Sequence, residues 1–236
     1  MHIPNLFLDL DNTITRSRQC ISPEMANVLQ RLAERTNITI VSGAAEWQII
    51  LQLDAVASCV AILAQNGNVC LNKDGKILWN RKLSTNNLEI IASHVEAIKL
   101  ASSYPTISEI DMVEMRGAQV SLSLVGHHAP IEEKERFDPT GQLRARLLKE
   151  TPLNSNEVEV RIGGTTCLDY SAKGQNKGFN ISMFMLIQQW WAWDCLYIGD
   201  QLFPDGNDES VCGWCPTWQV ENPGKTLSIL KGYLRA

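Results

Sequence analysis

The feature that most limits the folds open to this chain is the alternation of short apolar runs with amphipathic segments near both ends. The predicted strands of the first third lie at Leu6–Leu8, Ile38–Val41 and Ala61–Ala64. The segments between them have apolar residues at helical spacing, and Ser22 followed by Pro23 is typical of a helix start. Strand–helix alternation with short connections predicts a parallel sheet with helices on both faces.

The middle of the chain follows a different pattern. Helices are predicted over Leu88–Leu100 and Gln142–Lys149, and strands over Ile107–Met115, Gln119–Leu124 and Val158–Ile162. Helices against a mostly antiparallel sheet form a separate α+β unit. The first pattern then returns, with a helix over Gly178–Trp191, a strand over Cys195–Ile198 and a helix over Lys225–Leu234. We therefore expect an α/β core of residues 1–81 and 175–236, interrupted by an inserted α+β domain of residues 82–174.

The composition excludes several classes of protein. A chain of 236 residues with 44% apolar and 20% charged residues is expected to bury a sizeable core. The absence of a run of about 18 uncharged apolar residues argues against a membrane span. A net charge of −5 and a pI near 5.4 disfavour a nucleic-acid-binding protein. The N-terminus lacks a basic region, and seven scattered cysteines predict reduced thiols in the cytoplasm.

Two carboxylates follow the first predicted strand directly. Asp9 and Asp11 are two residues apart, so on an extended chain they project to the same side. Ligands of open parallel sheets bind beyond the carboxyl ends of the strands. A divalent cation and a phosphate group would relieve the repulsion between the two carboxylates. The alternative is a pair of turn aspartates that cap a loop.

Further polar residues follow other predicted strands or begin a helix. Gly199–Asp208 adds three carboxylates and an amide, an oxygen-rich set that suits Mg²⁺. Ser42 and Gly43 follow the second strand, and Lys177 begins a helix. A hydroxyl, a backbone N–H group and an ammonium are what a phosphoryl group needs for neutralisation. The joint occurrence of these elements favours a phosphate site over chance.

The order Asp-x-Asp-x-Thr, Ser-Gly, Lys and Gly-Asp with a later Asn-Asp resembles the haloacid dehalogenase superfamily of phosphoryl-transfer enzymes. The resemblance implies a Rossmann-like core in which Asp9 is the nucleophile that forms an aspartyl-phosphate and Asp11 is the general acid and base. It implies that Ser42 and Lys177 hold the phosphoryl oxygens. It also implies a set of Mg²⁺ ligands: Asp9, the carbonyl of Asp11 and Asp200, with Asn207 and Asp208 in support.

The inserted domain narrows the resemblance to the eukaryotic-type phosphomannomutases. The stretches Arg116–His127, Glu132–Phe137 and Gly163–Asp169 are similar to the cap of that family. The resemblance implies these substrate-binding residues: Arg18, Arg116, His127, Lys134, Cys167 and Asp169.

The sequence also departs from the family pattern. His127 and Lys134 stand where the family has arginine, Cys167 where it has serine, and Asn12 where it has glycine. Arginine grips phosphate with two hydrogen bonds, whereas lysine offers a point charge and histidine is only partly charged near neutral pH. A mutase must hold a second phosphate in the cap. Weakened cap cations therefore favour a phosphatase that passes the phosphoryl group to water.

Three functions remain open from the sequence. The leading one is a Mg²⁺-dependent phosphatase acting on a small phosphorylated sugar. The second is a phosphomannomutase that interconverts mannose 6-phosphate and mannose 1-phosphate, and the third is a non-catalytic phosphosugar-binding protein, which the presence of Asp9 disfavours. The oligomeric state is left open, with a homodimer through the inserted domain as one candidate.

Other signals are given structural interpretations. Cys212 and Cys215 form a Cys-x-x-Cys motif, for which inert thiols are favoured over a redox or zinc site. His127 and His128 are expected on a strand, with one facing a pocket and the other facing solvent or core. The tryptophans that follow the predicted helix are interpreted as core or partner contacts: Trp190, Trp191 and Trp193.

Overall fold

The computed structural model describes residues 4–102, 111–204 and 206–235. The chain divides into two compact units. The first comprises residues up to Asn80, Asn176–Pro204 and residues from Asp208 onward. The second comprises Arg81–Gln175 together with the short stretch that ends at Asn207.

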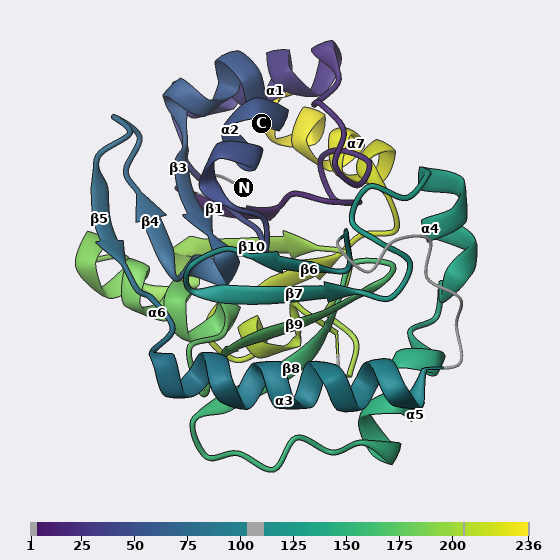
Figure 1. Ribbon diagram of the computed structural model, residues 1–236. Coiled ribbons are helices and arrows are strands. Elements are labelled where there is room, and N and C mark those ends of the chain that lie inside the picture. The colour runs from purple at the N-terminus through teal and green to yellow at the C-terminus, as the bar shows by residue number, and fades with distance from the viewer. Residues whose placement is uncertain (1–3, 103–110, 205, 236) are drawn as a thin grey trace. The chain divides into compact units, whose positions relative to one another are not determined.

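A seven-stranded sheet forms the centre of the first unit (Figure 1). Its order is β11-β10-β1-β2-β3-β4-β5; neighbours from β11 to β3 are parallel, whereas β4 and β5 are added antiparallel. The strands are β1 (Asn5–Asp9), β2 (Asn37–Val41), β3 (Ala61–Ala64), β4 (Val69–Leu71), β5 (Ile77–Asn80), β10 (Cys195–Gly199) and β11 (Thr217–Gln219). The predicted α/β class is thus confirmed.

Helices cover both faces of this sheet. They are α1 (Pro23–Ala33), α2 (Glu46–Leu53), α6 (Lys177–Gln188) and α7 (Pro223–Arg235), with short 3-10 turns η1 (Asp54–Cys59), η2 (Gln65–Gly67), η4 (Ala192–Asp194) and η5 (Glu209–Val211). Leu6 and Leu8 of β1 pack in one apolar cluster with α1, α2 and α7, whereas Phe7 packs in the other with α6. Alternate side chains of one strand therefore supply both layers of the core.

Local sequence explains where α1 begins and where the chain turns between β4 and β5. The Ser22 side chain accepts a hydrogen bond from the backbone N–H of Met25 and caps α1, with Pro23 at the first position. The predicted turn between β4 and β5 is present, and Gly75 takes the positive φ of +75° that the turn requires. Asn72 closes it by accepting the Gly75 N–H on its carbonyl oxygen.

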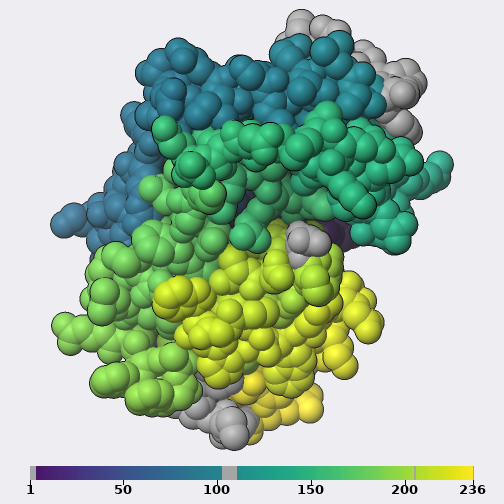
Figure 2. Space-filling model, turned by 90° about the horizontal axis from the view of Figure 1, so that it is seen from below, coloured from purple at the N-terminus to yellow at the C-terminus, as the bar shows by residue number. Residues whose placement is uncertain are grey.

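The second unit contains a four-stranded antiparallel sheet of order β6-β7-β9-β8. Its elements are α3 (Thr85–Ala101), β6 (Val113–Met115), β7 (Gln119–Ser123), α4 (Ile131–Phe137), α5 (Gln142–Glu150), β8 (Val158–Gly163) and β9 (Cys167–Ala172). One side of α3 is buried against the sheet through Ile91, Val95 and Ile98, and its other side is exposed, as Figure 2 shows in part. The predicted α+β pattern of this segment is confirmed.

Some predicted boundaries were wrong. The helix predicted to reach Trp191 ends at Gln188, because Gln189 adopts a left-handed conformation with a φ of +59°. The strand predicted over Ile107–Met115 is formed only at Val113–Met115, and residues 107–110 lie outside the described part of the chain. The strand β9 was missed, because polar residues interrupt its apolar ones. No helix among the described residues is long and apolar enough to cross a bilayer.

A buried arginine holds the second unit together. The Arg144 side chain of α5 is 2% exposed, and its Nε donates to Asp138 Oδ2 at 2.9 Å. Its Nη1 donates to the carbonyl oxygens of Gly163, Gly164 and Cys167 at 2.9–3.1 Å. One side chain thus ties α5 to the connection between β8 and β9.

Replacing Arg144 by methionine should lower the free energy of unfolding by about 3–5 kcal/mol, because Asp138 would be left as a buried charge without its partner. Urea denaturation followed by circular dichroism measures this. The matched control is Arg146→Met on the same helix, whose 66%-exposed side chain should contribute within about 0.5 kcal/mol. Equal losses for the two variants would contradict the assigned role of Arg144.

Candidate active site

Three carboxylates of the first unit converge where adjacent parallel strands end. Asp9 closes β1, Asp200 follows β10, and Asp208 lies on the loop beyond Asp200. One ligand oxygen of each lies within 4.8 Å of the others. Because β1 and β10 are neighbours in the sheet, residues almost 200 positions apart in sequence meet at one edge.

A buried ammonium joins two of these carboxylates. Lys177 begins α6, and its Nζ donates to Asp9 Oδ1 at 2.8 Å and to Asp208 Oδ1 at 2.6 Å. The side chain of Lys177 is fully buried, and the side chains of Asp9 and Asp208 are 9% and 1% exposed. Burial makes such a pair electrostatically strong and makes removal of either partner costly.

The backbone leaves no room for a side chain next to Lys177. A Cβ atom on Gly178 would lie 1.7 Å from the carbonyl oxygen of Ser210 in η5, and the Gly178 N–H donates to the Ser210 hydroxyl. The first turn of α6 therefore lies directly against the segment that follows Asp208.

Two hydroxyl groups also form hydrogen bonds with the carboxylates. The Thr13 hydroxyl lies 3.2 Å from Asp9 Oδ2 and 3.3 Å from Asp200 Oδ1. The Tyr197 hydroxyl donates to Asp208 Oδ1 at 2.7 Å. Thr13 was noted in the sequence only as part of the Asp-x-Asp-x-Thr motif, and Tyr197 was missed because a tyrosine within an apolar strand looks like a core residue.

The carboxylates carry more negative charge than the site neutralises. Burial raises the pKa of Asp9 well above its usual value, and Asp208 and Asp200 add to this effect against the opposing charge of Lys177. Burial and the neighbouring Asp208 raise the pKa of Asp200 to about 6. Burial alone would lower the pKa of Lys177, but Asp208 and Asp9 raise it above its usual value.

This charge balance fits a divalent cation. Ionisation of all three carboxyls beside one ammonium would leave a net charge of −2, which a divalent cation would neutralise. Carboxylate oxygens are the ligands that Mg²⁺ prefers, and Mg²⁺ needs only one or two of them besides water and phosphate oxygens. Asp9, Asp200 and Asp208 are the residues that could hold such an ion.

Other predicted residues of the first unit lie near the same sheet edge with different contacts. Asp11 Oδ1 accepts the backbone N–H of Arg18 at 2.7 Å and lies 3.4 Å from Gln52 Nε2. Ser42 is buried after β2, and its hydroxyl accepts the Ala44 N–H. The Arg18 residue is exposed. The roles predicted for these three residues stay predictions.

Two asparagines, Asn207 and Asn12, were also singled out in the sequence. Asn207 belongs to the second of the two compact units, and its role as a metal ligand stays a prediction. Asn12 adopts a left-handed conformation with a φ of +60°. Asparagine tolerates that conformation better than most residues, which explains why it stands where the family has glycine.

The second unit brings its predicted binding residues into one cluster around Glu114. Arg116 Nη2 donates to Glu114 Oε2 at 2.8 Å, and His127 Nδ1 lies 3.4 Å from the same oxygen. His127 Nε2 lies 3.0 Å from the carbonyl oxygen of Ser121, which can only accept, so this nitrogen carries a proton. Lys134 Nζ donates to the carbonyl oxygen of His127 at 2.5 Å.

Cys167 and Asp169 belong to the same cluster. Ser121 donates to Asp169 Oδ1 at 2.6 Å across the β7–β9 pair. A Cβ atom on Gly163 would lie 2.1 Å from Asp169 Oδ2, so only glycine leaves room for this carboxylate. Burial opposes ionisation of Cys167, but a hydrogen bond with His127 lowers the pKa of the thiol to about 7.

The adjacent histidines differ in exposure, but not for the predicted reason. The His127 side chain is 3% exposed and that of His128 is 86% exposed, where it pairs with Asp111. They lie in a turn after β7 rather than on a strand, and Gly126 with a φ of +98° begins this change of direction. His128 faces solvent, which is one of the two surroundings expected for one member of the pair, whereas the strand placement was wrong. That His127 faces a substrate pocket stays a prediction.

Two other sequence signals lie apart from the carboxylates. Cys212 and Cys215 are free thiols, exposed and buried respectively. Burial raises the pKa of Cys215 to about 12, which agrees with an inert thiol. Trp190 packs edge-on against Phe7, as expected of a core residue. Two exposed tryptophans stack at 4.9 Å, Trp191 and Trp193.

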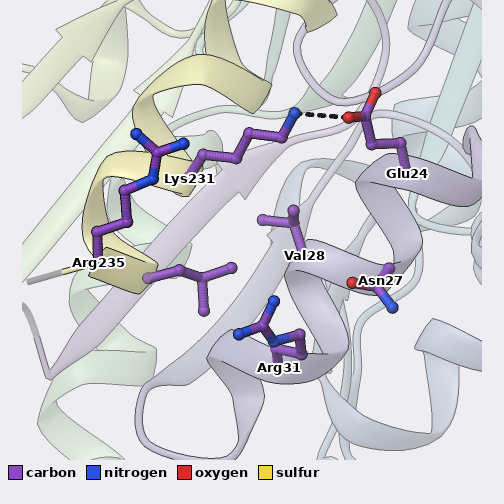
Figure 3. A pocket seen from close by; sticks show the side chains of 7 residues that line it. Glu24, Asn27, Val28, Arg31, Lys231 and Arg235 are labelled. Carbon is purple, nitrogen blue, oxygen red and sulfur yellow. Dashed lines mark hydrogen bonds and ion pairs between the residues drawn. The ribbon is translucent and has the colours of Figure 1, made fainter.

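A groove of about 300 Å³ between α1 and α7 lies elsewhere in the first unit (Figure 3). Arg31 and Arg235 line it from the last turns of these helices, where cations offset the partial negative charge of a helix end. Lys231 is paired with Glu24 at its other end. The charged side chains of the groove are explained by the Lys231–Glu24 ion pair and by the position of Arg31 and Arg235 at helix ends.

Comparison with known sequences agrees with this geometry. Residues 6–110 match a family model described as haloacid dehalogenase-like hydrolase. A Homo sapiens phosphomannomutase 1 is 25% identical over 218 residues, covering 86% of this chain and 80% of that protein. A Dictyostelium discoideum phosphomannomutase 2 is 26% identical over 241 residues, covering 95% of this chain and 94% of that protein.

Solved structures share the fold at lower identity. The Plasmodium falciparum IMP-nucleotidase bound to IMP aligns with a TM-score of 0.69 and 15% identity, over 99% of this chain and 68% of that one. A haloacid dehalogenase-like hydrolase from Bacteroides thetaiotaomicron aligns with a TM-score of 0.66 and 14% identity, over 99% of both chains. The chain therefore resembles the haloacid dehalogenase superfamily, and within it the phosphomannomutases, and these homologues indicate an enzyme that performs phosphoryl transfer.

Proposed function

We propose that this protein is a Mg²⁺-dependent phosphatase that acts on a small phosphorylated sugar through an aspartyl-phosphate. The observation that carries the proposal is the buried carboxylate of Asp9, held by Lys177 beside two further carboxylates. A carboxylate nucleophile divides phosphoryl transfer into two easier steps. Lys177 and the bound cation would offset charge on the transferring oxygens.

In the proposed reaction, a carboxylate oxygen of Asp9 attacks phosphorus and the bond from phosphorus to the sugar oxygen breaks. Asp11 gives its proton to the leaving sugar oxygen. Asp11 then takes a proton from a water molecule that attacks the phosphorus, which releases inorganic phosphate and regenerates Asp9. The Mg²⁺ ion, when bound, supplies positive charge that keeps Asp9 ionised and neutralises the phosphoryl oxygens.

The second unit favours a phosphatase over a mutase. The arginine kept from the family pattern, Arg116, donates to Glu114, and His127 faces the same carboxylate. Lys134 offers one ammonium, which donates to a backbone carbonyl oxygen. These cations are partly neutralised within the cluster, which weakens their attraction for a second phosphate.

A phosphomannomutase is the second candidate. The named relatives are phosphomannomutases at 25–26% identity, and the family residues Arg116 and Asp169 lie in one cluster. A panel of hexose phosphates assayed with Mg²⁺ for both free phosphate and isomer separates the two functions. Release of phosphate supports the phosphatase, and isomer without free phosphate supports the mutase. A folded protein that turns over no hexose phosphate would contradict both.

Asp9→Asn should lower turnover by about 10⁴-fold or more, because the amide keeps the shape of the side chain and loses its nucleophilicity. Phosphate release measures the effect, and circular dichroism verifies the fold. The control is Asp54→Asn on the surface of the same unit, which should keep wild-type turnover. Substantial activity of Asp9→Asn would show that another residue is the nucleophile.

Stabilisation by Mg²⁺ should increase with pH. Because the pKa of Asp200 is about 6 in the fold, this carboxyl stabilises the cation-free protein at low pH, and that contribution is lost as the pH rises through about 6. Mg²⁺ competes with the proton, so it should raise Tm more at about pH 7.5 than at about pH 5. Differential scanning fluorimetry at both pH values measures this, and an equal rise at both would contradict it.

His127→Arg should strengthen binding of a hexose bisphosphate about tenfold, because a guanidinium adds charged hydrogen bonds to the second phosphate. Isothermal titration calorimetry measures the dissociation constant, and circular dichroism verifies the fold. The neighbouring variant His128→Arg adds the same charge at an exposed position and should have little effect. If the affinity of His127→Arg does not exceed that of His128→Arg, the cluster is not the second phosphate site.

A further inference from the structure

The Tyr197 hydroxyl is a buried polar group within the carboxylate cluster. Tyr197 lies in the middle of β10, its side chain is fully buried, and its ring packs in the apolar cluster on the α6 side of the sheet. A phenylalanine would fill the same space without burying a polar atom. The hydroxyl is therefore the part of this side chain that packing does not explain.

The hydroxyl helps to fix Asp208. Asp208 Oδ1 accepts from the Tyr197 hydroxyl at 2.7 Å and from Lys177 Nζ at 2.6 Å. Asp208 Oδ2 accepts the Gln201 N–H at 3.2 Å and occupies the space where a Cβ atom of Gly199 would lie, 2.2 Å away. Three donors on three different segments thus determine the orientation of one carboxylate.

Removal of the hydroxyl would change how Lys177 is shared. The ammonium of Lys177 also holds Asp9, at 2.8 Å. Without the Tyr197 hydroxyl, Lys177 would be the remaining donor to Asp208 Oδ1 among the hydrogen bonds of the described residues. Closer approach of its ammonium to Asp208 would then lengthen its contact with Asp9. Hydrogen-bond partners of metal-binding carboxylates orient their ligands and tune the affinity for the metal.

We propose that Tyr197 is a positioning residue that aims Asp208 at the Mg²⁺ site and keeps Lys177 shared between Asp208 and Asp9. The proposal deepens the proposed function, on which it rests for the identity of the cation. It assigns a role to a residue that acts through Asp208, to which its hydroxyl donates.

The test is Mg²⁺ binding to the full-length protein by isothermal titration calorimetry, without substrate. Tyr197→Phe should raise the dissociation constant for Mg²⁺ about tenfold or more. The matched control is Tyr170→Phe in the second unit, which removes another buried hydroxyl, bonded to His94 at 3.0 Å, and should leave Mg²⁺ affinity unchanged. In the phosphatase assay, a higher Mg²⁺ concentration should restore turnover of Tyr197→Phe.

Each outcome decides the proposal. Equal Mg²⁺ affinity of the wild type and Tyr197→Phe, or an equal loss in both tyrosine variants, would overturn it. Wild-type protein that binds Mg²⁺ but turns over no hexose phosphate would contradict the proposed function, and the affinity of Tyr197→Phe would still decide the role of Tyr197. Wild-type protein that binds no Mg²⁺ would overturn the positioning role.

A second measurement needs no variant and covers the case in which Tyr197→Phe does not fold. The chain has four tyrosines, so selective isotope labelling gives four ring signals by nuclear magnetic resonance. Addition of Mg²⁺ to the wild type should shift the Tyr197 signal and leave that of Tyr170 in place. An unchanged Tyr197 signal at saturating Mg²⁺ would overturn the proposal.

Discussion

The ammonium of Lys177 lies between Asp9 and Asp208, and the arrangement of the first unit depends on this contact. Asp9 ends β1, Lys177 begins α6, and Asp208 precedes η5, so a single cation joins three segments at the carboxyl edge of the sheet. Burial favours the protonated form of Asp9, and without Lys177 this carboxyl would be still harder to ionise. Lys177 offsets only part of the negative charge, and the remainder is the basis for the proposed affinity for a divalent cation.

The second unit balances charge in a different way. Arg116, His127 and Lys134 supply cationic or partly cationic groups, and Glu114 and Asp169 supply the opposing carboxylates. The cluster is therefore close to neutral, in contrast to the acidic site of the first unit. Such a cluster suits polar hydroxyl groups of a sugar better than a second dianion, which agrees with the proposed preference for a monophosphate.

Much of this organisation could be predicted from the sequence, because it follows from backbone direction. Apolar runs that end in Asp9, Ser42 and Gly199–Asp200 placed these residues at one sheet edge before any side-chain contact was known. Contacts set by packing could not be predicted in the same way. Tyr197 looks like any core residue of a strand, Glu114 lies between apolar strand residues without a recognisable motif, and the turn at Gly126 breaks the alternation on which the strand placement of His127 relied.

The close approach of Gly178 to the carbonyl oxygen of Ser210 limits movement at the proposed phosphate site. The backbones on either side of Lys177 and Asp208 already touch, so neither segment can approach the other further. The ammonium and carboxylates are consequently assembled in advance, and in the proposed reaction little conformational entropy would be lost as the phosphoryl group enters. A rigid electrostatic environment of this kind lowers a reaction barrier without a structural rearrangement at the moment of bond exchange.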